Sequence, residues 1–442
     1  MAAAGAAWLI PRRAEALPHS RADAGQPFGA GIDPATLRAR LEALSVYGRP
    51  DGAGFEGGVS RVAYSDADVA GRAYVMGLMR EAGLAPRIDP AGNIFARRDG
   101  REPGAAPILF GSHIDSVPQG GNFDGDLGVL ASIGVIEALR ARGRVTRHPL
   151  ETVVWAHEES ATFGRGLAGS RIVAGDLAPG DLAHTWNGMT REQAIAKIGG
   201  APGRIREAAR ARGSLHAYLE LHIEQGGTLE RQSIPIGVVQ GIVAIDGFDA
   251  VIRGFANHAG TTPMADRQDA LVAASHLTLA VRDIVTSRPG RQVGTVGHVE
   301  VSPNSPNVIP GEVRLSIELR DLEPATLKTL GAAIAARAEQ IARDTGTRIE
   351  LVPNRHNPPA EADAAIQDAI ARAADRRGLG AVRMPSGAGH DAQMMARLCP
   401  MGMIFVPSIG GISHSPRERT TWEDCARGAD VLLDTVLAMD EN

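Results

Sequence analysis

The spacing of apolar residues after residue 33 predicts helices and strands in alternation. Asp33 can cap a helix over residues 34–44, in which Pro34 takes the favoured first position. A second helix is expected to start after Ser65 and to end near Gly83. The sequence then predicts strands at residues 93–97, 107–112 and 152–156 and a helix at residues 129–142. Such alternation predicts an α/β fold with a mixed, mostly parallel sheet and flanking helices, and ligands gather at the carboxyl ends of its strands.

The pattern changes in the middle of the chain. There the predicted elements are, in order, strand 245–254, helix 265–288, strands 293–301 and 312–320, helix 326–343 and strand 348–352. This β-α-β-β-α-β order is that of a ferredoxin-like unit, in which two helices cover one antiparallel sheet. We therefore expect an inserted domain at residues 238–352. Helix 360–376 and strand 402–407 return the chain to the first domain, which we assign to residues 33–237 and 353–442.

Composition and charge are those of a globular protein. The 442 residues are 44% hydrophobic and 22% charged, with a formal net charge of −5, and a chain of this length favours two domains. Only 4% of the residues are aromatic and no basic stretch occurs, which argues against a nucleic-acid partner. Residues 1–32 are expected to form a disordered extension whose apolar part is too short to span a membrane. The two cysteines, Cys399 and Cys425, lie in no CxxC pair and suit a cytoplasmic, reducing location.

Histidines and carboxylates cluster at the predicted strand ends. His113 follows strand 107–112, and Asp115 two residues later is placed to hold the second ring nitrogen of His113. Asp124 lies in the glycine-rich segment 120–125, where missing side chains let a carboxylate approach a metal closely. Further candidates of the same two chemical types are Glu158, Glu159, His222 and His414. Imidazole nitrogen and carboxylate oxygen are the ligands of zinc and similar divalent ions.

Taken singly, these residues have plainer interpretations. A lone histidine at a strand end is more often structural than a metal ligand, and a pair of glutamates more often belongs to a solvated face. Segment 120–128 lacks the spacing of a P-loop and of a dinucleotide-binding turn. Several such pieces at strand ends nevertheless favour one metal site over as many unrelated structural roles.

Taken in order, the motifs resemble those of the hydantoinase/carbamoylase amidases, which belong to the M20 di-zinc peptidase-like superfamily. The resemblance is carried by His113-Ile114-Asp115, residues 120–125, Glu158-Glu159, residues 222–226, residues 258–264 and Ser413-His414-Ser415. It covers nearly everything after about residue 33. It implies a catalytic domain with two divalent metal ions, zinc first and manganese or cobalt as alternatives. It also implies a smaller lid domain through which two subunits form a homodimer.

The resemblance implies a role for each motif residue. Asp124 would bridge two metals, one completed by His113 and His222 and the other by Glu159 and His414. Glu158 would be the general base, and Asp115 would support His113 from behind the metal. The implied contacts with a small-molecule substrate are Gln225, His258, Asn307, Arg320 and Gly389, with His258 a candidate to reach into the partner subunit.

For the lid residues, the sequence leaves a second role open. Arg320 can bind a substrate carboxylate through its planar guanidinium group, or it can pair with the neighbouring Asp321. Asn307 lies in a Pro- and Asn-rich segment that is equally typical of a turn. His258, two residues before Gly260, has a context suited to closing over a substrate and stabilising an oxyanion.

The expected activity is hydrolysis of the linear amide or ureido C–N bond of an N-carbamoyl amino acid, which releases the amino acid, carbon dioxide and ammonia. Allantoate, N-carbamoyl-β-alanine and N-acyl amino acids are the alternative substrates, and a non-catalytic binding protein on the same fold is the alternative class. One segment departs from the family pattern. Many relatives follow the glutamate pair with a small residue and then Arg-Phe, whereas here Ala161-Thr162-Phe163 keeps the Phe alone. The departure leaves the ligand set intact and bears on the shape of the substrate pocket.

Overall fold

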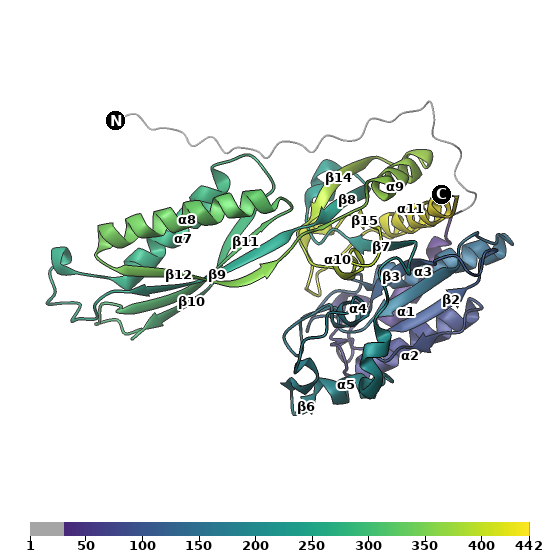
Figure 1. Ribbon diagram of the computed structural model, residues 1–442, viewed down its shortest axis with the longest axis horizontal. Helices are drawn as coiled ribbons and strands as arrows, with labels where there is room; N and C mark the ends of the chain where they lie inside the picture. The colour runs from purple at the N-terminus through teal and green to yellow at the C-terminus, as the bar shows by residue number, and fades with distance from the viewer. Residues whose placement is uncertain (1–30, 442) are drawn as a thin grey trace. The chain divides into compact units, whose positions relative to one another are not determined.

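The computed structural model describes residues 31–441, which divide into two compact units (Figure 1). The smaller unit is Ile242–Ala360, and the larger unit comprises residues 31–241 and 361–441. Most of the expected disordered extension, residues 1–32, lies outside the described residues. Ile32 is described: its side chain is buried and its amide donates a hydrogen bond to Asp430 (2.7 Å), so ordered structure begins before residue 33. None of the helices within residues 31–441 has the length and apolar character needed to cross a membrane.

A nine-stranded sheet forms the centre of the larger unit. Its strand order is β1-β2-β4-β3-β7-β15-β8-β13, with β14 beside β8. The strands are β1 (Arg87–Ile88), β2 (Ile94–Arg98), β3 (Ile108–His113), β4 (Leu150–Trp155), β7 (Ala217–Ile223), β8 (Ile236–Ile242), β13 (Ala360–Glu361), β14 (Ala381–Ser386) and β15 (Met401–Val406). The inner strands β4, β3, β7 and β15 run parallel, while β2 runs antiparallel to β1 and β4, and β8 runs antiparallel to β15. The predicted mostly parallel sheet is confirmed. A separate two-stranded sheet pairs β5 (Thr185–Trp186) with β6 (Met189–Thr190).

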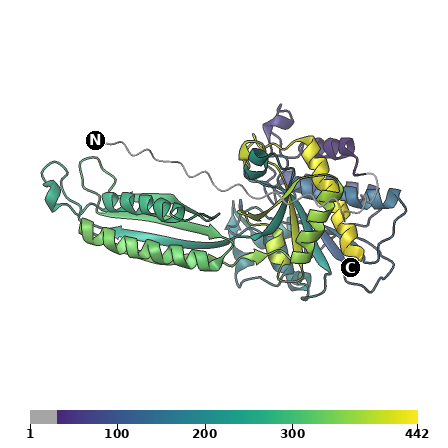
Figure 2. The same ribbon diagram turned by 90° about the horizontal axis from the view of Figure 1, so that it is seen from above.

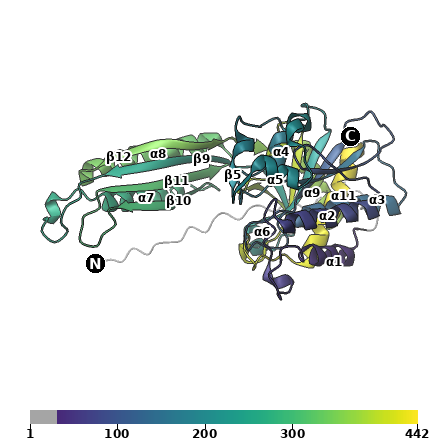
Figure 3. The same ribbon diagram turned by 90° about the horizontal axis from the view of Figure 1, so that it is seen from below.

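Helices cover the sheet of the larger unit (Figures 2 and 3). They are α1 (Pro34–Leu44), α2 (Asp66–Glu81), α3 (Asp126–Ala141), α4 (Ala168–Val173), α5 (Arg191–Lys197), α6 (Thr228–Gln232), α9 (Ala364–Arg376), α10 (Asp391–Met395) and α11 (Trp422–Glu441). Asp33 caps α1 and Ser65 caps α2, as predicted. Helix α9 begins four residues later than predicted because Asp363 caps it and residues 360–361 form β13.

Strand β7 shows how the sheet separates two environments. Its odd-numbered residues Leu219, Leu221 and Ile223 belong to the main hydrophobic core with α3 and α11. Its even-numbered residues point to the other face, where Glu220 accepts a hydrogen bond from the backbone amide of Ala392 in α10 (3.1 Å). His222 shares this polar face, so the alternation of one strand aims the histidine away from the core.

The smaller unit has the predicted β-α-β-β-α-β order. Its elements are β9 (Ala244–Arg253), α7 (Ala270–Thr286), β10 (Val293–Ser302), β11 (Glu312–Asp321), α8 (Pro324–Thr345) and β12 (Arg348–Asn357). The antiparallel sheet has the order β10-β11-β9-β12, and α7 and α8 lie on one face of it (Figure 1). Alternate residues of β11, from Val313 to Leu319, are buried beneath these helices. Helix α7 starts five residues later than predicted because Asp269 caps it.

Candidate metal centre and active site

The candidate ligands follow the carboxyl ends of adjacent parallel strands. His113 is the last residue of β3, and His222 is the penultimate residue of β7. Glu158 and Glu159 follow β4, Asp124 lies between β3 and α3, and His414 lies beyond β15. Because β4, β3, β7 and β15 are neighbours in the sheet, these residues meet at one edge of it.

Two groups of potential ligand atoms share Asp124. The first group is His113, Asp124 and His222, and the second is Asp124, Glu159 and His414. Asp124 Oδ1 faces the first group, 3.0 Å from His222 Nε2 and 3.6 Å from His113 Nε2. Its Oδ2 lies 3.3 Å from His414 Nε2, which is also 3.3 Å from Glu159 Oε1. One carboxylate oxygen of Asp124 therefore serves each group.

The tautomers of His113 and His222 suit a cation. Each Nδ1 lies 2.9 Å from a backbone carbonyl oxygen, of Asp115 and of Ile223 respectively, and a carbonyl can only accept. Each Nδ1 is therefore the donor, and in the neutral imidazole the lone pair of Nε2 points toward Asp124. His222 Nε2 is buried and has no hydrogen-bond partner among the described residues. When the imidazole is neutral, its lone pair faces that of the carboxylate, and a cation between them, either a proton or a metal ion, stabilises the pair.

The site also raises the proton affinity of its histidines. Burial alone would lower the pKa of His222, but the nearby charge of Asp124 raises it above its usual value. Hydrogen bonds to Asp124 and Glu159 raise the pKa of His414 to about 11. The histidines in turn hold the pKa of Asp124 well below its usual range, against the effect of burial. The site therefore stabilises positive charge at the positions that a metal would take.

Buried acids surround the two groups, and no lysine or arginine neutralises them. Asp124, Glu158 and Glu159 are each less than 10% exposed. Within residues 31–441, histidines supply all their ion-pair partners, and no Lys or Arg pairs with them. Burying several carboxylates that have no Lys or Arg partner costs several kcal/mol per charge, by the usual magnitude for ions. The residues present therefore fit two divalent cations in both charge and chemistry.

Asp115 has a different contact from the one expected. Its carboxylate was predicted to hold His113, but that carboxylate is 3.9 Å from His113 Nδ1, and the backbone carbonyl of Asp115 takes the bond instead. The Asp115 carboxylate accepts hydrogen bonds from the backbone amides of Glu158 and Glu159, both at 3.1 Å. Asp115 thus supports both His113 and the glutamate pair, and it does so from two different atoms.

Glu158 lies beside the two groups without completing either one. Its Oε2 is 3.8 Å from His113 Nε2. Burial and the charge of Glu159 raise the pKa of Glu158 well above its usual range, although His113 opposes this. His157 just before it has a φ of 53°, a left-handed conformation that turns the chain away from β4 and directs the two glutamates to the site. A carboxylate with a raised pKa suits proton transfer near neutral pH.

A glycine provides the room that His113 needs. Gly125 has a φ of 69°, and a Cβ there would lie 2.6 Å from atoms of the His113 ring. Only glycine satisfies both the conformation and the close approach. The glycine-rich segment was predicted to let a carboxylate approach a metal, and in the structure this glycine makes space for the imidazole.

Two predicted substrate contacts lie in the larger unit. Gln225, with a φ of 58°, donates from Nε2 to Asp124 Oδ2 at 2.7 Å, and its buried Oε1 has no partner among residues 31–441. Gly389 lies in the loop between β14 and α10, next to His390, whose ring centroid is 4.4 Å from that of His222. Both residues therefore border the ligand groups.

A third group of potential ligands consists of Glu220, His222 and His390. Glu220 is a weak candidate because its two oxygens already accept three hydrogen bonds, from Ser112, Tyr218 and Ala392. His390 Nε2 lies 2.9 Å from Ser386 Oγ. We assign these residues to a buried polar network behind His222.

The three remaining predicted contacts belong to the smaller unit. His258 pairs with Val308 in an isolated β-bridge, and the amide of Ala259 donates to the carbonyl of Asn307 (3.0 Å), so His258 and Asn307 lie together. Arg320 bonds to Glu318 (Nη2–Oε1 2.7 Å) rather than to Asp321, the partner considered from sequence.

Arg320 is far from the other two contacts within this unit. The His258 and Asn307 segments meet just beyond the Glu312 end of β11, whereas Arg320 is near the opposite end. Eight residues of extended strand span roughly 26 Å. One small substrate cannot touch both ends of β11 in a single copy of the unit.

Sequence reasoning missed two buried acids at the site, Glu220 and Glu418. The alternation of β7 offered a signal for Glu220, since it shares a face with His222. Glu418 lies between Arg417 and Arg419, and such a charged run is typical of a solvated loop. The sequence held no sign of its burial.

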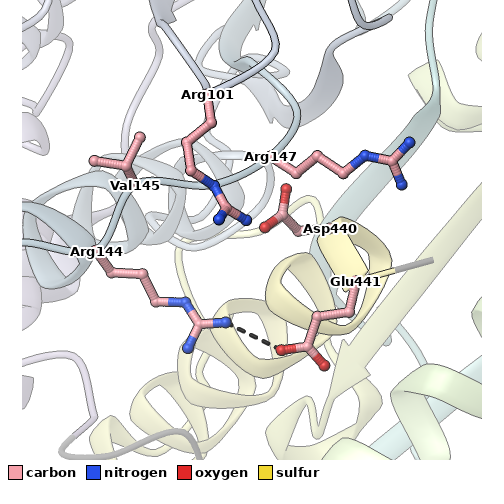
Figure 4. A pocket seen from close by; sticks show the side chains of 6 residues that line it. All are labelled: Arg101, Arg144, Val145, Arg147, Asp440 and Glu441. Carbon is pink, nitrogen blue, oxygen red and sulfur yellow. Dashed lines mark hydrogen bonds and ion pairs between the residues drawn. The ribbon is translucent and has the colours of Figure 1, made fainter.

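One cavity of the larger unit lies outside this site. It has a volume of about 500 Å³ and is lined by Arg101, Arg144, Val145, Arg147, Asp440 and Glu441 (Figure 4). Arg144 Nη2 binds Glu441 Oε1 at 3.0 Å, so the basic and acidic side chains that line the cavity neutralise one another in part. None of the candidate ligands lines it.

Comparison with known proteins places this geometry in a family. Residues 109–438 match the model of peptidase family M20/M25/M40. The chain is 42% identical over 381 residues to an N-carbamoyl-L-amino acid amidohydrolase of Geobacillus stearothermophilus, covering 86% of this chain and 93% of the relative. It is 38% identical over 383 residues to the ureidoglycolate hydrolase of Arabidopsis thaliana, covering 85% and 80% respectively.

Solved structures agree with these matches. The crystal structure of a hydantoinase/carbamoylase-family amidase from Burkholderia multivorans superposes with a TM-score of 0.86 at 37% identity, covering 93% of this chain and 99% of that one. A tripeptidase from Staphylococcus aureus, at 16% identity and a TM-score of 0.65, shares the fold. The chain therefore belongs to peptidase family M20/M25/M40, within its hydantoinase/carbamoylase amidases, and is an amidohydrolase.

Proposed function

We propose that this enzyme hydrolyses the ureido C–N bond of N-carbamoyl amino acids and that it uses two divalent metal ions. The observation that carries the proposal is the position of Asp124, whose two oxygens face two separate groups of histidine and carboxylate ligands. The relative from Geobacillus stearothermophilus, which carries the name of this activity, supports the choice of substrate.

The ligand sets follow from the distances. His113, Asp124 and His222 would hold one ion, and Asp124, Glu159 and His414 the other. Zinc is our first choice, with manganese and cobalt as alternatives, because nitrogen and oxygen ligands suit all three. When bound, such ions lower the pKa of water and polarise a carbonyl oxygen.

Glu158 is the proposed general base. Its carboxylate accepts a proton from the attacking water and returns it to the leaving nitrogen, so that the C–N bond breaks as the amine becomes neutral. The burial that raises its pKa makes it a competent proton acceptor and donor. Asp115 holds the Glu158 backbone amide and so fixes the start of this side chain.

The acid end of the substrate is assigned to Arg320. Its guanidinium matches the two oxygens of a carboxylate. To bind the substrate, Arg320 would exchange its ion pair with Glu318 for one with the substrate carboxylate. Gln225 and Gly389, beside the ligand groups, are the proposed contacts of the ureido end. We assign Arg320 to the catalytic site of its own subunit, as a proposal that the hybrid-dimer experiment below tests.

His258 and Asn307 are assigned to the catalytic site of a second copy of the chain. They lie roughly a strand's length, about 26 Å, from Arg320 in the same unit, which is too far for a common small substrate. The smaller unit would then be a lid and dimerisation domain.

The surface of the smaller unit supports dimerisation. Strand β10 pairs with β11 alone among the described strands, which leaves one edge open. Val293 and Val299 of β10 and Leu271, Val272 and Leu279 of α7 are exposed apolar residues. An open edge with exposed apolar side chains is suited to pairing with another copy.

A substrate panel tests the proposed activity. The purified enzyme would be assayed with N-carbamoyl-L-methionine, N-carbamoyl-β-alanine, allantoate, ureidoglycolate and an N-acetyl amino acid, after reconstitution with zinc, manganese or cobalt. We expect the highest kcat/KM with the N-carbamoyl α-amino acid. Ureidoglycolate is included because the Arabidopsis relative bears that name. A preference for any other member of the panel would overturn the substrate, and a protein that binds no divalent ion would overturn the metal dependence.

A further inference from the structure

Glu418 is a fully buried acid that binds both the loop of Asp124 and the residue before His414. It lies in the loop between β15 and α11, and its side chain is 0% exposed. Its Oε1 accepts hydrogen bonds from the backbone amides of Phe123 (3.0 Å) and Asp124 (3.1 Å). Its Oε2 accepts one from the hydroxyl of Ser413 at 2.8 Å. Three donors thus converge on one carboxylate, and none of them belongs to its own immediate neighbours.

These bonds connect two loops that are distant in the sequence. Phe123 and Asp124 belong to the loop before α3, which carries the shared ligand. Ser413 directly precedes His414, a ligand of the second group. The carboxylate of Glu418 therefore fixes the distance between Asp124 and His414, which have no covalent connection nearby.

The Ser413 hydroxyl has a second acceptor within reach. Its Oγ lies 3.1 Å from Asp124 Oδ2, the oxygen that faces the second group. A hydroxyl has one proton and can donate it to one acceptor at a time. The shorter bond to Glu418 draws that proton away from Asp124 Oδ2, which accepts from Gln225 Nε2 at 2.7 Å and so keeps one lone pair for a metal.

The glycine-rich loop is shaped around the same carboxylate. A Cβ at Gly121 would overlap the side chain of Glu418. The absence of a side chain at this position is therefore explained by Glu418, which the loop encloses from residue 121 to Asp124.

We propose that Glu418 is a positioning residue that builds the second metal group, formed by Asp124, Glu159 and His414. The first group depends on it less, because His113 and His222 are held by backbone carbonyls of their own strands and loops. His414 is 49% exposed at its side chain and lies in a loop, so it depends most on the link through Ser413. This inference rests on the proposed binding of two metal ions.

The test is the affinity for each ion, measured on the full chain without reference to turnover. The protein would be stripped with a chelator and titrated with zinc or cobalt, with bound metal counted by elemental analysis and by calorimetry. For Glu418→Ala we expect one ion to bind as in the wild type and the other to bind about 10- to 100-fold more weakly, the range for loss of a residue that orients a ligand. Glu418→Gln keeps an oxygen that can accept from both amides, and its Nε2 can donate to the Ser413 hydroxyl oxygen, so it should restore part of the lost affinity.

Two further variants separate positioning from loss of stability. Asp434→Asn removes another fully buried carboxylate, one that binds Arg377 and none of the candidate ligands, and should lower stability without changing either affinity. Ser413→Ala cuts the link to His414 alone and should also weaken one ion. If Glu418→Ala does not fold, Ser413→Ala tests the positioning role in its place.

The outcomes are distinct. If the wild type binds two ions and Glu418→Ala, or Ser413→Ala in its place, binds both equally well, the positioning role is wrong. Equal weakening of both ions, or a Glu418→Gln variant no better than Glu418→Ala, also overturns it. If the wild type itself binds no divalent ion, the proposed function fails before Glu418 is tested.

Discussion

Asp124 Oδ1 lies 3.0 Å from His222 Nε2, a buried nitrogen with no hydrogen-bond partner among the described residues. The opposite side of the same imidazole is fixed, since His222 Nδ1 donates to the carbonyl of Ile223. The nitrogen and the carboxylate oxygen both offer lone pairs when the imidazole is neutral, and such a contact is unfavourable without a cation. A folded chain that places such an atom against a carboxylate is arranged to hold a cation between them.

Replacing the shared carboxylate should therefore disable both ion sites together. In Asp124→Asn the side chain keeps its size but loses its charge, and each group loses one ligand. We expect affinity for divalent ions to fall by more than about 100-fold, since loss of an outer-shell partner alone costs 10- to 100-fold. Elemental analysis after dialysis measures this directly. Retention of two tightly bound ions would show that Asp124 is not shared.

The neighbours Glu158 and Glu159 should behave differently when each is changed to glutamine. Glu158→Gln retains both ions but cannot accept a proton, and kcat should fall by about 10²- to 10⁴-fold, the usual contribution of a general base. Glu159→Gln removes a ligand and should lose one ion instead. Metal content and kcat, measured on the same preparations, separate the two roles. Normal turnover by metal-loaded Glu158→Gln would exclude it as the base.

Much of this arrangement follows from local sequence rules. Apolar runs identify β3 and β4, and the parallel sheet that they imply places residues such as His113 and Glu159 at one edge. Capping chemistry placed the start of α1 correctly because Asp33 and Pro34 act within one turn. These are short-range effects, which a sequence displays directly.

The contacts that sequence did not reveal are long-range hydrogen bonds. The Asp115 carboxylate binds amides more than 40 residues away, at Glu158 and Glu159, whereas the sequence suggested the nearby imidazole. Glu418 binds amides almost 300 residues earlier, at Phe123 and Asp124. Nothing in a local pattern records such pairing, because it depends on how separate loops meet in the folded chain.

The buried thiols should be unreactive until the protein unfolds. Cys399 and Cys425 are both buried and unpaired, and burial raises the pKa of Cys399 to about 12. The thiolate is the reactive form, so little of it exists at neutral pH. A chromogenic disulfide reagent should titrate no thiol in the native protein and two after denaturation. Rapid reaction of either cysteine in the native state would contradict this.

His216 should make the larger unit less stable in acid. Its ring stacks on His148 at 4.1 Å between centroids, and burial together with His148 lowers the pKa of His216 below its ordinary value of 6.5. Above that value His216 is neutral in both states and the fold keeps its full stability. As pH falls below it, the unfolded chain takes up the proton first and stability is lost.

The comparison that isolates this effect is the change in Tm between pH 7.5 and 5.5. It should be smaller in His216→Gln than in the wild type, because an amide does not titrate and can still donate to the carbonyl of Met439. His184→Gln, at an exposed histidine, is the matched control and should follow the wild type. An unchanged acid sensitivity in His216→Gln would refute the assignment.

Hybrid dimers test whether His258 serves the site of the other subunit. Glu158→Gln and His258→Ala should each be nearly inactive alone. In a hybrid of the two, the subunit with an intact Glu158 would receive an intact His258 from its partner, and one complete site would form. Refolding them together should restore about a quarter of wild-type activity, since half of randomly formed dimers are hybrids with one site each. A hybrid of Glu158→Gln with Arg320→Gln should stay inactive. Arg320 and Glu158 are assigned to the same site of one subunit, so each subunit of this hybrid lacks one of the two. Recovery in the second mixture and not in the first would reverse the assignment of the two ends of β11.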